Sequence, residues 1–131
     1  MKYLVDTSVF VHSVLSQPRL SHRAIKLLTD GSSELFLSAV SPWEITIKVG
    51  TGKLVLPVSP AEFVTRAVQT MSLQALNITY LHALEVDELP THHRDPFDRM
   101  LIAQARIEGM TILTDDKIFQ RYVVKQVYCG R

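Results

Sequence analysis

Five short apolar segments alternate along the chain with longer stretches of helical periodicity. The segments predicted to form strands are residues 3–5, 35–37, 76–79, 110–114 and 123–128. Parallel strands need a crossover connection long enough to hold a helix, so strands that alternate with helices favour a parallel sheet. Right-handed crossovers then place the helices on the faces of that sheet. We predict an α/β fold, a three-layer α/β/α sandwich around a mostly parallel central sheet.

Size and composition fit a single globular domain over residues 1–131. Hydrophobic residues make up 47% and charged residues 21%, and the formal net charge of +1 confines any nucleic-acid surface to a local patch. Cys129 is the only cysteine, which excludes an internal disulfide and suits a reducing compartment. The apolar start is interrupted by Asp6, too early for a signal peptide, and no apolar run approaches the roughly 20 residues of a membrane span. We expect a cytoplasmic protein without membrane contact.

A helix is predicted to begin after Asp95 and to end before Gly109. A residue before proline avoids the α region, so Asp95 suits the N-cap and Pro96 the first helical position. Asp98 follows three residues after Asp95, and both carboxylates therefore share one face near the positive end of the helix. Either the two acids only cap the helix, or they also belong to a chemical site.

Two more helices are predicted to begin at a serine followed by proline, Ser41-Pro42 and Ser59-Pro60. Glu44 lies in the first turn of the former helix, and its role has two alternatives. In a capping box its carboxylate accepts from the backbone N–H of Ser41, whereas in a metal site it is directed into a cleft. An ion pair with Lys48, four residues later, is a further possibility at the helix surface.

Two of the predicted strands end directly at a carboxylate. Asp6 follows the strand at 3–5, and Asp115 and Asp116 follow the strand at 110–114. In open α/β sheets, ligands bind at the carboxyl ends of the strands. Asp6 is therefore either a ligand at that edge or a cap for the helix that follows it.

An acidic site is predicted where four of these residues converge: Asp6, Glu44, Asp98 and Asp116. Two carboxylates about 5 Å apart repel by roughly 3 kcal/mol at an effective dielectric near 20. Four such groups need proton uptake or a cation to stay together. Oxygen ligands without histidine or cysteine select Mg²⁺ or Mn²⁺. The matching chemistry is metal-assisted attack of water on a phosphodiester.

Four motifs occur in order along nearly the whole chain: Tyr3-Leu4-Val5-Asp6-Thr7-Ser8, residues 38–45 (SAVSPWEI) with Lys48 and 52–54, residues 93–105 (HRDPFDRMLIAQA), and Leu113-Thr114-Asp115-Asp116 with Phe119. In this order and spacing they resemble the PIN-domain ribonucleases, in particular the VapC-type toxins of type II toxin–antitoxin systems that carry an HxDPFDR motif. The HRDPFDR stretch is the most specific of the four. The resemblance implies a single PIN-like nuclease domain with a three-layer α/β/α fold.

Carried over residue by residue, the resemblance implies that Asp6, Glu44, Asp98 and Asp116 hold Mg²⁺ or Mn²⁺. Asp98 matches the acid of the family's helix, because the LIAQA segment follows it at the expected offset. Asp95 belongs to the extended motif as a ligand, as a group that supports the ligands, or as the helix cap. Thr114 is implied to orient a carboxylate or water, and Thr7 or Ser8 to do similar work.

The activity implied by the resemblance is endoribonuclease cleavage of tRNA, rRNA or mRNA, which inhibits translation. The implied partners are a cognate antitoxin that blocks the acidic groove and a second copy of the chain in a homodimer. Cations beside the motifs are candidates to hold RNA phosphates that the carboxylates alone repel: Lys48, Lys53, His92, His93, Arg94 and Arg99. For Arg94 and Arg99 the alternative is to balance neighbouring acids. Two other functional classes are a catalytically silent PIN-like module that binds RNA or a partner, and a DNA-directed nuclease.

Overall fold

The computed structural model describes residues 1–131, and its centre is a five-stranded sheet in which every neighbouring pair is parallel. The strands lie in the spatial order β3-β2-β1-β4-β5, with the bounds β1 (Lys2–Val5), β2 (Glu34–Ser38), β3 (Gln74–Leu76), β4 (Thr111–Thr114) and β5 (Gln126–Tyr128). The predicted α/β fold is confirmed, and the sheet is wholly rather than mostly parallel.

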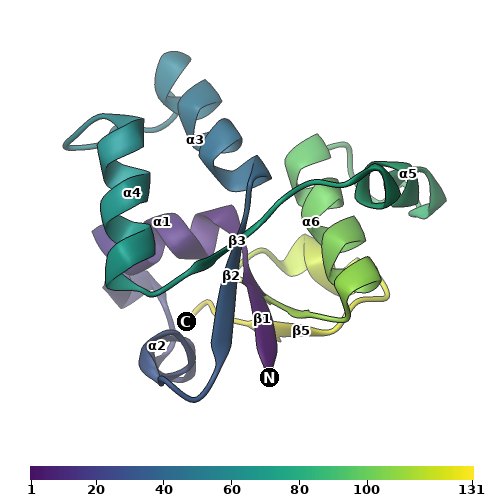
Figure 1. Cartoon of the computed structure of the whole chain (residues 1–131), viewed down its shortest axis with the longest axis horizontal. Coiled ribbons are helices and arrows are strands. Elements are labelled where there is room, and N and C mark those ends of the chain that lie inside the picture. Colours follow the sequence, from purple (N-terminus) through teal and green to yellow (C-terminus); the bar gives the residue numbers. More distant parts are fainter.

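Helices cover both faces of the sheet, which makes the molecule a three-layer sandwich (Figure 1). One face is covered by α1 (Thr7–Leu15), α2 (His22–Thr29) and α4 (Pro60–Thr70). The other is covered by α5 (Tyr80–Glu88) and α6 (Pro96–Glu108). The remaining elements are α3 (Val40–Gly50), which contributes to both cores, and the short 3-10 helices η1 (Gln17–Arg19) and η2 (Lys117–Arg121). None of these helices combines the length and apolar character that a membrane span requires.

The central strands β1, β2 and β4 are largely apolar because both of their faces are buried. Successive side chains of a strand point to opposite faces, so Tyr3 and Val5 pack with α1, α2 and α4, whereas Leu4 packs with α6. In β2, Leu35 lies in the former core and Phe36 in the latter. Each strand is thereby fixed in register by two cores, which also fixes the residues that follow its carboxyl end.

The order of the strands creates a crevice at the carboxyl end of β1. The chain proceeds from β1 to β2 and β3 on one side, and then crosses to β4 and β5 on the other. Helices that leave neighbouring strands toward opposite faces open a ligand-binding crevice at such a point. Val5 of β1 is in register with Leu113 of β4, so Asp6 and Thr114 lie side by side at this crevice.

Two predicted strands differ from the observed ones. The third strand ends at Leu76 rather than Thr79, because Thr79 caps α5: its hydroxyl accepts from the backbone N–H of His82, and His82 Nδ1 accepts from the N–H of Thr79. The last strand begins only at Gln126, because residues 122–124 form a bend in which the Val124 N–H donates to the Tyr122 carbonyl. Local caps and turns override the β propensity of both segments.

Two of the three predicted serine or aspartate caps are confirmed. Ser59 caps α4 and Asp95 caps α6, whose C-cap Gly109 has a φ of 68°, the left-handed conformation that glycine adopts without strain. The prediction for Ser41 is wrong, since α3 begins one residue earlier and Ser41 lies inside its first turn. Its buried hydroxyl instead shares a 2.8 Å hydrogen bond with Thr7 Oγ1, which ties α3 to the start of α1.

Candidate active site

Asp6 lies at the bottom of the crevice, almost fully buried at 3% exposure. Thr114 Oγ1 donates a hydrogen bond of 2.8 Å to Asp6 Oδ2, as the side-by-side register of β1 and β4 predicts. Burial raises the pKa of Asp6 to about 7, reinforced by the charges of Asp115 and Glu44 and opposed by the Thr114 hydrogen bond. Thr114 therefore orients this carboxylate, and the site disfavours its charge.

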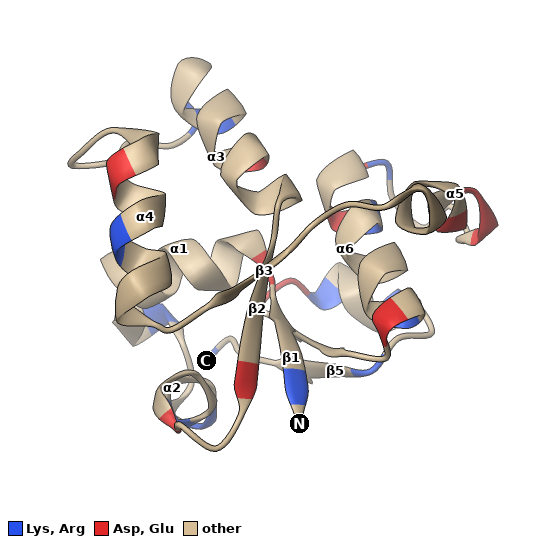
Figure 2. Ribbon diagram, viewed as in Figure 1, with Lys and Arg blue, Asp and Glu red and all other residues tan.

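Asp98 is the residue on which the acidic side chains act together. It lies in the first turn of α6. Burial is the largest cause that raises its pKa, to about 8, and the negative charges of four other acids add to the effect. In decreasing order of effect these acids are Asp6, Asp95, Glu44 and Asp116. In Figure 2 the acidic positions on α3, on α6 and beyond β1 surround the middle of the molecule between α3 and α6. All four predicted ligands and Asp95 are thus brought into one electrostatic group.

Glu44 reaches this group from α3 with 3% exposure. Its Oε2 lies 2.6 Å from Lys48 Nζ, and its buried Oε1 has no hydrogen-bond partner at all. A buried carboxylate oxygen without a donor is unfavourable, so it marks a position where a further donor or a cation would stabilise the protein. The capping-box alternative for Glu44 is excluded by geometry, because α3 has no side-chain cap.

Asp95, Asp115 and Asp116 occupy three different settings. Asp95 Oδ1 accepts from the backbone N–H groups of Phe97 and Asp98, which makes Asp95 the cap of α6. Asp116 is exposed and begins η2 by accepting from the Ile118 N–H, and its own backbone N–H donates to Thr114 Oγ1. Asp115 instead lies 2.7 Å from His12 Nδ1, on the side of α1. Of the two neighbours, Asp116 is the one that acts on Asp98.

A hard divalent cation fits these residues. No three acidic, histidine or cysteine side chains form a closed chelating cluster, but Mg²⁺ usually keeps several waters and takes only one or two carboxylates directly. The donors are carboxylate oxygens, one of them buried without a partner, and burial together with the charges of neighbouring acids raises the pKa of two of the carboxyl groups. The residues that would hold the ion are Asp6, Glu44, Asp98 and Asp116.

Comparison with known proteins decides the family, because the model of the PIN domain matches residues 3–125. The chain belongs to the PIN-domain family. Comparison with curated proteins found no match. Among solved structures, the chain is similar to VapBC2 from Rickettsia felis bound to a DNA fragment from its promoter, with 16% identity, a TM-score of 0.74, and coverage of 99% of this chain and 100% of that chain.

Two further solved structures share the fold of this PIN domain. FitAcB from Neisseria gonorrhoeae has 18% identity and a TM-score of 0.67 over 95% of both chains. VapBC-5 from Mycobacterium tuberculosis, a member of the VapBC family of toxin–antitoxin systems, has 16% identity and a TM-score of 0.63 over 97% of this chain and 98% of that chain. At such identities the likeness establishes the fold, and it spans nearly the full length of the PIN domain.

Arg99, a predicted phosphate contact, has another role in this PIN domain. Its guanidinium donates to the backbone carbonyls of Val86, Leu89 and Pro90 and to the hydroxyl of Tyr122. These bonds tie α6 to the end of α5, so the Arg99 donors are used inside the domain. Arg99 is therefore not part of the surface that we propose for RNA.

A hydrogen-bonded chain runs from Arg99 to Asp98. The guanidinium donates to the Tyr122 hydroxyl at 3.2 Å, and this hydroxyl lies 2.7 Å from His93 Nδ1. The ionised Asp98 carboxylate at the other ring nitrogen can only accept, so Nδ1 is the nitrogen that accepts from the hydroxyl. Burial keeps the pKa of His93 below its usual value, which favours the neutral ring. The proton of that ring then lies on Nε2 and is directed at Asp98 Oδ2, 3.3 Å away. His93 thus orients Asp98 rather than projecting toward solvent.

The other predicted cations differ in their freedom to reach RNA. The pKa of Lys48 is raised overall. Burial lowers it, but the hydrogen bond with Glu44 and the negative charges of Glu44 and of two aspartates at the start of α6 together have the larger, opposite effect. Lys48 is therefore a cation within the acidic group. Arg94 and Lys53 are exposed and form no ion pair. His92 packs edge-on against Tyr122, with the ring centroids 4.8 Å apart.

Tyr122 is the site residue that the sequence did not indicate. It follows η2 without any motif and is 4% exposed, and its importance comes only from contacts with residues 29 and 23 positions earlier in the chain. The sequence predicts Ser41 only as a helix cap, although its hydroxyl forms a hydrogen bond with the hydroxyl of Thr7, the residue after Asp6. Neither contact has a sequence signal, because both depend on how distant helices pack.

Replacing Tyr122 with phenylalanine is expected to reduce nuclease activity by about tenfold, because loss of a group that orients a metal ligand typically has an effect of roughly 10 to 100-fold. Without the hydroxyl, nothing fixes the tautomer of His93, and Asp98 loses its directed donor. The ring packing is retained, so the melting temperature should change little. Steady-state rates at several Mn²⁺ concentrations measure the effect, and Tyr80→Phe on α5, 90% exposed, is the matched control. Unchanged activity of Tyr122→Phe at every Mn²⁺ concentration would contradict this positioning role.

Proposed function

We propose that this PIN domain is a metal-dependent endoribonuclease and the toxin of a toxin–antitoxin pair, acting in the cytoplasm on tRNA, rRNA or mRNA. The observation that carries the proposal is the setting of Asp98, whose carboxyl group lies in the combined field of four other acids at the crevice of the sheet. A group of this kind has no structural use that an apolar side chain would not serve better. Such a group of carboxylates is suited to bind a divalent cation.

The roles of the protein groups follow from their contacts. When bound, Mg²⁺ or Mn²⁺ would activate water and stabilise the leaving oxygen of a phosphodiester. Thr114 holds Asp6 in one orientation, and His93 holds Asp98. Lys48 offsets the charge of Glu44 in the absence of an ion. Because phosphates and carboxylates repel each other, RNA approaches this group only with a cation between them.

Cleavage of single-stranded RNA by the purified chain tests the proposal. We expect cleavage with Mg²⁺ or Mn²⁺, none with EDTA, and recovery when the metal is restored. A single-stranded DNA of the same sequence, run beside the RNA, separates a ribonuclease from a DNA-directed nuclease. RNA binding without cleavage at any metal concentration would favour the catalytically silent module and contradict the proposed activity.

We further propose a small antitoxin as a partner. The solved structures to which this chain is similar include VapBC2, FitAcB and VapBC-5, the last a member of the VapBC family of toxin–antitoxin systems. An apolar groove of about 700 Å³ lies between α1, α2 and α4, large enough to accept side chains of a partner helix. Co-expression with the protein encoded beside this gene should yield a complex in which RNA cleavage is inhibited.

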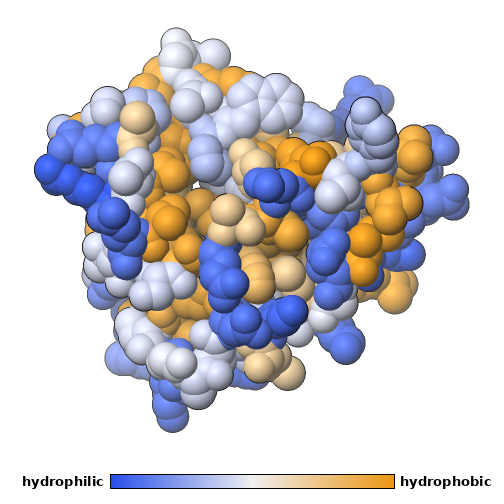
Figure 3. Space-filling model, viewed as in Figure 1, coloured by the Kyte–Doolittle hydropathy of each residue, from blue (hydrophilic) through white to orange (hydrophobic).

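A homodimer is also part of the proposal. Trp43 of α3 is 58% exposed while its ring packs edge-on against Phe97 of α6, with 5.2 Å between the centroids. Leu81 and Leu84 of α5 are 66% and 69% exposed, and hydrophobic side chains gather over this helix at the right of Figure 3. Exposed apolar side chains of this size suit a protein interface. The mass of the purified chain by light scattering tests the dimer.

A further inference from the structure

A second hollow, of about 570 Å³, adjoins the acidic group on the side of α1 and the chain's last residues. It is lined almost wholly by polar side chains from α1, η1, η2 and the segment after β5. Asp116 belongs both to this lining and to the acids that act on Asp98. The hollow and the proposed active site therefore share Asp116.

The cations of this hollow outnumber its free acids. Arg19, Lys117 and Arg131 line it together with Asp115 and Asp116. Lys117 and Arg131 are exposed and form no ion pair. Their charges are thus available to a ligand, and anions are the ligands that suit them.

Asp115, one of the two acids of this wall, already has a hydrogen-bond donor within the protein. Arg19 Nη1 lies 3.2 Å from His12 Nε2, and a guanidinium can only donate, so Nε2 is the acceptor. The ring proton then lies on Nδ1, which donates to Asp115 Oδ2 at 2.7 Å. This Arg19–His12–Asp115 chain sets the charge of Arg19 against that of Asp115, so that Asp116 is the one acid of the lining left opposite Lys117 and Arg131.

Tyr128 supplies an aromatic surface in the same hollow. Its ring is 37% exposed, with Lys117 Nζ 5.7 Å from the ring centroid. The ring lies directly on the backbone of Gly130, where any β-carbon would overlap with the phenol group. A β-carbon at 130 would force the ring to move, so the glycine allows the ring to lie where it does.

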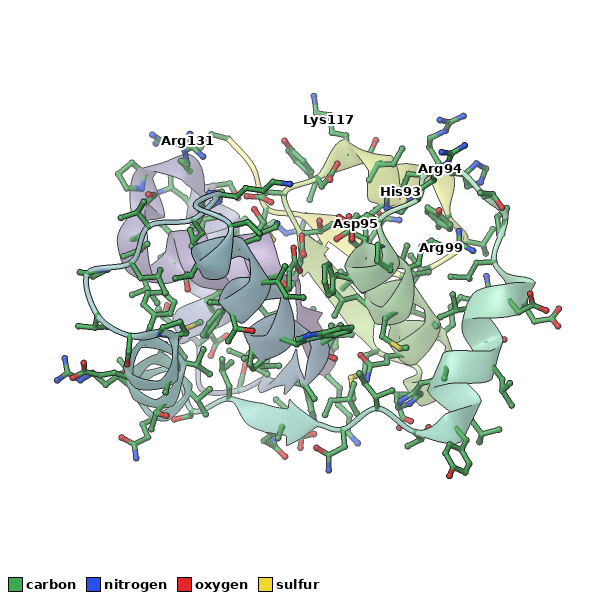
Figure 4. The ribbon with its side chains drawn as sticks, turned by 90° about the horizontal axis from the view of Figure 1, so that it is seen from above. His93, Arg94, Asp95, Arg99, Lys117 and Arg131 are labelled. Atoms are coloured by element: carbon green, nitrogen blue, oxygen red, sulfur yellow. The ribbon has the colours of Figure 1, made fainter.

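Cations continue past the acidic group on its other side. In Figure 4, Arg131, Lys117 and Arg94 are spread along one side of the molecule, and Asp95 lies between Lys117 and Arg94. Arg94 is exposed and without an ion pair. A polyanion that follows these cations passes over the carboxylates.

We propose that the hollow binds the part of a single-stranded RNA next to the bond that is cleaved, with Lys117 and Arg131 on a phosphate and an unpaired base on Tyr128. The inference rests on the proposed ribonuclease function and names the surface that places the substrate. Cations hold the phosphate backbone of single strands, and aromatic side chains stack with bases that are not paired. The strand then continues over Asp98 toward Arg94.

Binding of a fluorescent single-stranded RNA to the Asp98→Asn protein, measured by anisotropy, tests the proposal without cleavage. Adding Lys117→Gln and Arg131→Gln should weaken binding by roughly tenfold and lower the slope of log Kd against log salt by about 0.7 for each cation removed. Lys117→Arg should retain binding. Lys2→Gln, at the opposite end of β1, is the matched control and should have no effect.

Tyr128→Leu should weaken binding of the single strand by about tenfold but leave double-stranded RNA unaffected, because only unpaired bases stack. Gly130→Ala should act in the same direction by displacing the ring. In the cleaving enzyme, Lys117→Gln should raise KM and leave kcat unchanged.

The outcomes separate the two proposals. If the parent neither binds nor cleaves RNA, the ribonuclease function and the hollow are both wrong. If the parent binds and cleaves RNA but the Lys117→Gln, Arg131→Gln protein keeps its affinity and salt slope, only the hollow is overturned. Loss of affinity for single and double strands alike in Tyr128→Leu would overturn the stacking of a base.

Discussion

Asp98→Asn is expected to lower the rate of RNA cleavage by more than about a hundredfold, beyond the effect typical of groups that only orient a ligand. The amide is of the same size but carries no charge and binds Mg²⁺ poorly. In the metal-free protein at pH 8 the same change should raise the melting temperature, because it removes a carboxylate that repels Asp6, Glu44 and Asp116. Cleavage rates and thermal melts in EDTA measure the two effects on one preparation.

The matched control is Asp87→Asn on α5, an exposed aspartate without a hydrogen bond to any side chain. It should change neither quantity. A fall in both activity and stability of Asp98→Asn would indicate a structural role for this carboxylate. Wild-type activity of Asp98→Asn would remove Asp98 from the active site.

The metal-free protein is expected to lose stability as pH rises from about 4 to 8. In the folded state the pKa of Asp6 is about 7 and that of Asp98 about 8, against 3.8 for an unperturbed aspartate. Groups with a raised pKa bind more protons when folded, so their contribution is fully present below pH 3.8 and is lost as pH passes through 7 and 8. A decline of about 2 kcal/mol or more in the free energy of unfolding is expected over this range.

Urea titrations in EDTA at several pH values measure this slope. Mg²⁺ should reduce this loss of stability with rising pH. The ion binds the carboxylates only in the folded protein, so it stabilises the folded state more as these carboxyl groups ionise. Asp98→Asn should have a shallower slope in EDTA, and Asp87→Asn the slope of the parent. A metal-free stability that rises steadily between pH 4 and 8 would contradict the mutual repulsion of these acids.

The features that the sequence predicted well depend on local physics or on register. A short buried strand with an acid at its end, as at Asp6, fixes that acid at the sheet edge wherever the strand lies in a parallel sheet. The pairing of Asp6 with Thr114 then follows from two strands of similar length. The caps Ser59 and Asp95 are equally local, since each needs only backbone N–H groups two or three residues away.

Other features depend on contacts between distant elements, which a single sequence does not show. Ser41 has the sequence of a cap but meets Thr7, 34 residues earlier. Arg99 stands in the acidic motif, yet the backbone carbonyls at and just after the end of α5 accept from its Nη1 and Nη2. The hollow takes Arg19, Lys117, Tyr128 and Arg131 from separate elements, and none of these four residues belongs to a motif. Such positions become visible only when the helices are placed.

Binding of Mn²⁺ by isothermal titration calorimetry at pH 7.5 tests most directly that the four carboxylates form one metal centre. The metal-free parent should bind Mn²⁺ and release protons as it does so, because carboxyl groups with raised pKa must ionise to become ligands. Asp6→Asn, Glu44→Gln and Asp98→Asn should each weaken binding strongly, whereas Asp87→Asn should bind like the parent. Binding that is unaltered by all three substitutions, or no binding by the parent, would contradict the account.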